Sequence, residues 1–100
     1  MAILNVAEFN TMGGGSNFPA AVVQVPPIAS QNVAIGGTST PSNAFAPATT
    51  IVRIHTDVAC AIAFGAAPTA VATGIVLAAG ATEYFAVPAG QNYKVAVITP

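Results

Sequence analysis

Short apolar runs separated by glycine and proline set the pattern of this chain. The runs mix Ala with Val, Ile and Thr, and a turn-forming residue recurs roughly every ten positions, a spacing typical of sandwiches and barrels. We therefore expect an all-β fold, a small β-sandwich or jelly-roll-like barrel. The expected strands are 21–25, 33–36, 50–56, 59–64, 74–77, 83–87 and 93–99. The expected turns are 26–27, 36–37, 65–68, 79–80 and 88–90.

The strand expected at 50–56 has the clearest alternation of apolar and polar side chains. Successive side chains of a strand point to opposite faces of the sheet. Val52 and Ile54 should therefore lie on one face, and Arg53 and His55 on the other. This pattern predicts a sheet with one face in the core and one polar face.

The strand expected at 59–64 combines one face of large side chains with one of small ones. Cys60, Ile62 and Phe64 share a face, and the alanines between them make the opposite face flat. We expect another sheet or another subunit to pack closely on the alanine face. The last strand, 93–99, is apolar on both faces apart from Lys94, which predicts a central or covered strand.

The first fifty residues carry weaker signals. Residues 10–17 (NTMGGGSN) are typical of a flexible hinge. Residues 37–50 form a long loop of Ser, Thr, Pro and Ala, and such loops are often functional or extend over a neighbour. Residues 2–9 form either another strand or an arm. We predict an N-terminal arm and Gly-rich hinge over 1–19, and a compact β-domain over 20–100.

The scarcity of charged residues bears on how the protein acts as well as on its fold. Only 5% of the residues are charged, 54% are hydrophobic and the net charge is −1, whereas about 25% charged residues are usual. Nucleic-acid binding needs several Lys or Arg, so no nucleic-acid partner is expected. A net charge near zero promotes association. We predict a homo-oligomer, the alternative being a monomer with a surface of neutral polar residues.

Residues 58–82 form an uncharged stretch that is long enough to span a membrane as a helix. Gly65, Pro68, Gly74 and Gly80 interrupt it, and no basic residues flank it. We therefore expect no membrane partner.

Arg53, His55 and Asp57 form the one polar cluster in the sequence, with Glu83 as a further partner. A metal site needs three or four converging ligands, and a Ser-His-Asp triad needs a suitably held serine; neither is evident. We expect a structural charge cluster or a subunit contact, with no catalytic, metal-binding or cofactor-binding residue and no enzymatic activity. Cys60, the single cysteine, is expected to be a small buried apolar side chain.

The second half of the chain, residues 50–99, resembles a known class of proteins in its order of motifs. RIHTD is followed by ACAIAFG and PTA, then by LAAGATEYFAV and PAGQ, and finally by VAVI. This order resembles small virion structural proteins of tailed bacteriophages, and in particular head decoration (cement) proteins. The resemblance carries no active-site residues.

The resemblance implies a binding function at the outer capsid surface of the virion. Decoration proteins clamp capsomer junctions, often as trimers, and bury surface against their own copies and the major capsid protein. A tail, fibre or head-to-tail component is the alternative within the virion. A small carbohydrate-binding β-sandwich that uses Tyr84, Phe85 or Tyr93 is an alternative of another class, and these aromatic residues are otherwise expected in the core.

Overall fold

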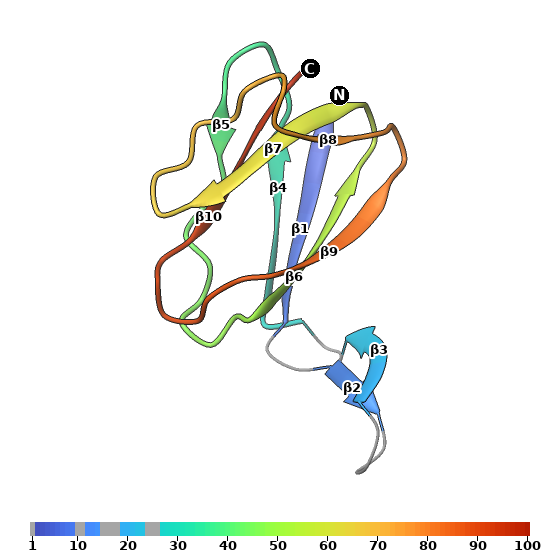
Figure 1. Cartoon of the computed structure of the whole chain (residues 1–100), viewed down its shortest axis with the longest axis vertical. Coiled ribbons are helices and arrows are strands. Elements are labelled where there is room, and N and C mark those ends of the chain that lie inside the picture. Colours follow the sequence, from blue (N-terminus) through green and yellow to red (C-terminus); the bar gives the residue numbers. More distant parts are fainter. Residues whose placement is uncertain (1, 10–11, 15–18, 24–26) are drawn as a thin grey trace.

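Two antiparallel four-stranded sheets face each other in the computed structural model of this chain, which describes residues 2–9, 12–14, 19–23 and 27–100 (Figure 1). Sheet 1 has the order β4-β1-β6-β9 and sheet 2 the order β5-β10-β7-β8. The all-β, sandwich-like fold expected from the sequence is confirmed. The strands of sheet 1 are β1 (Ile3–Phe9), β4 (Ala29–Ala34), β6 (Ile51–Thr56) and β9 (Thr82–Ala86). Those of sheet 2 are β5 (Thr40–Pro41), β7 (Cys60–Gly65), β8 (Ile75–Leu77) and β10 (Lys94–Ile98).

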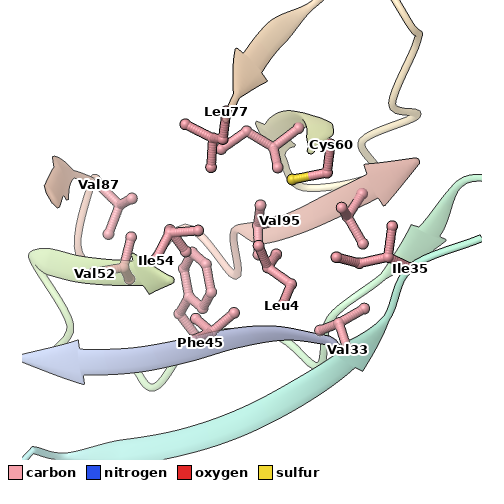
Figure 2. Packing of buried hydrophobic residues seen from close by; sticks show 13 residues of the cluster. Leu4, Val33, Ile35, Phe45, Val52, Ile54, Cys60, Leu77, Val87 and Val95 are labelled. Carbon is pink, nitrogen blue, oxygen red and sulfur yellow. The ribbon is translucent and has the colours of Figure 1, made fainter. Parts of the chain in front are cut away.

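The hydrophobic core lies between the two sheets and follows the alternation of the strands (Figure 2). Val52 and Ile54 are fully buried, as the pattern of 50–56 predicts, and they face Cys60 and Ile62 of sheet 2. Leu77 of β8 and Val87 after β9 close the core on one side. Among the described residues no helix is long and apolar enough to cross a membrane.

Residues 3–9 do not form the predicted arm; they form β1, the strand between β4 and β6. The sequence ILNVAEF places Leu4, Val6 and Glu8 on the inner face, and all three are buried. A strand with this alternation is stable only inside a sheet that buries one of its faces. The described residues after β1 form a separate hairpin of β2 (Met12–Gly14) and β3 (Pro19–Val23). The rest of the predicted hinge, residues 10–11 and 15–17, lies outside the described residues.

Part of the alanine face of β7 is buried within the chain itself, while Ala63 is half-buried and Ala59 is exposed. Ala61 of β7 and Ala96 of β10 are fully buried on this outer side of sheet 2. Residues 66–73 run from the end of β7 past β5 before they return to β8 (Figure 1). In this segment Ala70 is buried, and its N–H donates to Ser39 Oγ at 2.8 Å. Small side chains allow this close approach. The central position predicted for the last strand is confirmed, since β10 lies between β5 and β7.

The long loop predicted at 37–50 folds onto its own domain. After β5, the Ser42 N–H donates to the Val95 carbonyl at 2.7 Å, and the Phe45 N–H donates to the Tyr93 carbonyl at 2.8 Å. The Phe45 ring is buried, and its centroid lies 6.5 Å from that of Phe64. The loop therefore extends the edge of sheet 2 and closes one end of the core.

Two of the predicted turns depend on glycine in the left-handed region of φ. Gly80, with φ +77°, lies in the turn that connects β8 of sheet 2 to β9 of sheet 1. Gly90, with φ +74°, lies in the turn that connects β9 back to β10. Residues with a Cβ rarely adopt this conformation. These turns make consecutive strands alternate between the sheets at this side of the sandwich.

Candidate functional site

The charge cluster predicted from the sequence is only partly assembled by the fold. Arg53 and His55 lie together on the outer face of sheet 1, because β6 turns its other side chains into the core. Asp57 follows the end of β6, and its Oδ1 accepts a hydrogen bond from the Ile3 N–H at 2.8 Å. The carboxylate therefore fixes the start of β1.

Glu83 lies on the opposite side of sheet 1 from Arg53. The register of β9 against β6 pairs Glu83 with Ile54, whose side chain faces inward, and pairs Tyr84 with Arg53. Among the described residues, Arg53 forms no ion pair with Glu83 or with Asp57. The subunit-contact role of these residues remains a prediction.

Two rows of side chains cross the outer face of sheet 1. The polar row consists of Asn32, Asn5, His55 and Thr82, which are paired in register across β4, β1, β6 and β9. Asn5 Nδ2 donates to Asn32 Oδ1 at 2.9 Å, and His55 Nδ1 lies 2.8 Å from Thr82 Oγ1. The neighbouring row pairs Ser30, Ala7, Arg53 and Tyr84 in the same order of strands.

Of the three aromatic residues considered for ligand binding, Tyr84 alone is exposed, with 52% of its surface accessible. Phe85 points the other way and packs on Phe64, with 5.0 Å between the ring centroids. Tyr93 is half-buried against the core. Of these three aromatic residues, the fold thus places Tyr84 on the polar face, next to Arg53.

Glu8 is a buried carboxylate that the sequence analysis did not single out. Its side chain is 2% exposed. Oε1 accepts hydrogen bonds from the Ala46 N–H at 2.7 Å and from Thr49 Oγ1 at 2.8 Å. Glu8 occupies the third inward-facing position of β1, after Leu4 and Val6. An acidic residue at a position that alternation assigns to the core is the sequence feature that could have identified it. Glu8 anchors the loop before β6 to the end of β1.

Cys60 is fully buried at the start of β7. Burial raises its pKa, a hydrogen bond with the Thr56 side chain acts in the opposite direction, and the nearby Asp57 carboxylate raises it further. The folded state therefore holds the thiol proton more tightly than the unfolded chain does. Within the described part of the chain, no three His, Cys, Asp or Glu residues are grouped closely enough to hold a metal ion.

This shift predicts a loss of stability at alkaline pH that depends on Cys60. Because the folded-state pKa is raised, stability is complete below the ordinary thiol pKa of about 8.5 and falls as the pH rises above it, by up to about 1.4 kcal/mol per pH unit. In urea unfolding between about pH 7 and 10, the free energy of unfolding should fall more steeply for the natural protein than for Cys60→Val. Parallel curves for the two proteins would contradict the prediction.

The edge of sheet 2 at β8 is exposed and apolar. Val71, Ile75 and Val76 are 54%, 45% and 56% exposed, and we call these three residues the β8 edge. The Gly74 N–H donates to the Val71 carbonyl at 3.0 Å, so a tight turn leads from Val71 directly into β8. Residues 66–81 contain no ionisable side chain. The β8 edge therefore offers apolar side chains and unpaired backbone groups without any charge.

Comparison with protein-family models, with curated proteins and with solved structures gives no match to this chain.

Proposed function

We propose that this protein is a virion structural protein that binds the outer surface of a phage head as a homo-oligomer and stabilises capsomer junctions. The observation that supports this proposal best is the β8 edge, a patch of exposed, uncharged, apolar residues on an edge strand. The resemblance of residues 50–99 to decoration proteins gives the proposal its virion context and favours a trimer.

Edge strands pair readily with other chains, and natural proteins usually protect them. In this fold β5 is short and ends in Pro41, and the edge strand β9 carries the charged Glu83. The edge strands β4 and β8 have neither a proline nor a charge, and of the two it is β8 that carries large exposed apolar side chains, Ile75 and Val76. Pairing with another copy or with the major capsid protein would satisfy its free backbone groups and cover Val71, Ile75 and Val76.

The proposed mechanism is stabilisation by mass action. A protein that binds the assembled shell and not its separated parts shifts the equilibrium towards the shell. Apolar and backbone contacts are screened little by salt, unlike contacts between exposed charges. Binding to heads should therefore change little with ionic strength, and strong weakening at high salt would contradict this mechanism.

A lysine in the β8 edge should break self-association. In Val76→Lys, association would bury the new ammonium group, so the association constant should fall at least about tenfold, or about 1.4 kcal/mol. Light scattering at several concentrations should show an oligomer for the natural protein and the monomer mass of 9.8 kDa for the variant. Ala34→Lys adds the same charge at an exposed position of the opposite edge strand β4, and should remain oligomeric.

Two results would overturn the proposal. The first is a natural protein that stays monomeric at high concentration and also fails to bind heads; the second is equal dissociation by the two lysine variants. Imaging particles with and without the protein then locates it. Density on the tail, on a fibre or at the head-to-tail junction, with none on the head, would favour the alternative virion component.

A further inference from the structure

We propose that the outer face of sheet 1 is a binding site for an acidic saccharide, with the carboxylate of the sugar on Arg53 and the sugar ring on Tyr84. This site is independent of the β8 edge, which belongs to sheet 2. It goes beyond the head-binding function, since its ligand is a glycan and not a capsid protein.

Arg53 and Tyr84 provide the first part of the argument. They are directly paired across β6 and β9, and such cross-strand neighbours have Cβ atoms about 4.5–5.5 Å apart. A guanidinium group binds carboxylates through two parallel hydrogen bonds. An exposed tyrosine offers a flat apolar face together with a hydroxyl group. The pair therefore matches a ligand that carries a carboxylate next to a ring with an apolar face.

The acidic residues of the chain leave this guanidinium free for a ligand. Glu8 is buried on the inner side of β1, and Glu83 lies on the opposite side of sheet 1. Asp57 accepts the Ile3 N–H beyond the end of the strand. The sequence contains three acidic residues in all, and none of them occupies the outer face. Arg53 is thus the one permanently charged side chain in the two rows described above.

The polar row supplies hydrogen-bonding groups for hydroxyls. It lies two residues along the strands from the Arg53 row, a distance of about 6.5–7 Å. Asn5 donates through Nδ2, which leaves its Oδ1 for a ligand, and Asn32 accepts through Oδ1, which leaves its Nδ2. His55 engages Thr82 through Nδ1, which leaves Nε2. The polar row thus offers both donors and acceptors to the hydroxyl groups of a ligand.

A saccharide fits this face better than an acidic peptide does. An acidic peptide or a nucleic acid is held mainly by several cations, and the two rows contain one Arg and one His. Most of the remaining side chains are neutral amides and hydroxyls, which suit a ligand with many hydroxyls and one carboxylate per ring.

The test compares a charged saccharide with its neutral form, using the full chain. Binding of trigalacturonic acid and of its full methyl ester is measured by isothermal titration calorimetry. The acid should bind at least about threefold more tightly than the ester, since one exposed ion pair is lost. Arg53→Gln should remove that preference, and Tyr84→Ala should weaken both ligands by about tenfold. Lys94→Gln on sheet 2 removes the other cation of the chain and should change neither affinity.

Several outcomes would overturn the site. They are no binding of either saccharide, equal binding of acid and ester, and equal effects of Arg53→Gln and Lys94→Gln. A tetraglutamate peptide that binds as tightly as the trisaccharide would reassign the face to acidic peptides. Light scattering of Arg53→Gln and Tyr84→Ala should show the oligomer of the natural protein. A change of mass in these variants would identify the face as a subunit contact instead.

Discussion

Replacement of Glu8 by alanine is expected to lower the free energy of unfolding by about 2–5 kcal/mol. The Ala46 N–H and the Thr49 hydroxyl lose their shared acceptor and are left without it in the interior, and each unsatisfied buried donor costs about 1–3 kcal/mol. The loop that carries both donors also loses its connection to β1. Urea unfolding monitored by circular dichroism measures the change.

Two matched variants separate the hydrogen bonds of Glu8 from its charge. Glu8→Gln keeps a carbonyl oxygen at the same place and should lose about half as much stability, since charged acceptors bind about twice as strongly as neutral ones. Thr49→Val removes one donor. The double variant Glu8→Ala, Thr49→Val should be non-additive by about 0.5–3 kcal/mol, as for residues in direct contact. Additive effects would contradict the network.

Truncation of Leu4 to alanine is expected to destabilise the protein by about 2–5 kcal/mol, the usual range for a leucine in a closely packed core. Leu4 is fully buried and lies at the centre of the cluster in Figure 2. The measurement is again the midpoint and slope of urea unfolding. The result also tests whether residues 3–9 are an integral strand.

Ile3→Ala provides the matched control for Leu4. Ile3 is the preceding residue of β1, points to the opposite face and is only half-buried. Its truncation should cost clearly less than that of Leu4. Small and equal losses of unfolding free energy at both positions would contradict a core strand at residues 3–9. Such losses would be expected of a detached arm.

The second half of the fold was predictable because its strands carry their own signals. Strands β6 to β10 lie within a residue or two of the ranges expected from alternation and from turn residues. Strand β4 begins at Ala29, four residues before the expected 33–36. Its sequence ASQNVA has few apolar residues because an edge strand is held mainly by its pairing with β1. Strand β5 has two residues and no periodicity of its own.

Only the part of the candidate site that lies on a single strand could be predicted from the sequence. Alternation places Arg53 and His55 on one face, and the structure agrees. The positions of Glu83 and Tyr84 depend instead on the register between β6 and β9, and a shift of one residue exchanges their faces. The partners of Glu8 lie 38 and 41 residues further along the chain. Contacts between residues so far apart in the sequence depend on the order of the strands in the sheets. The local sequence pattern does not specify that order.

The topology also sets the order in which a newly synthesised chain acquires its structure. Strand β1 is made first, but one of its neighbours in sheet 1 is β6, at residues 51–56, and β10 fills the middle of sheet 2 with residues 94–98. Folds dominated by such distant pairings form slowly. We expect the polypeptide to leave the ribosome as far as Ile98 before either layer becomes stable. Once the uncharged segment 66–81 has left the ribosome, it is then accessible to other nascent chains until β10 has joined sheet 2, and aggregation competes with folding during that interval.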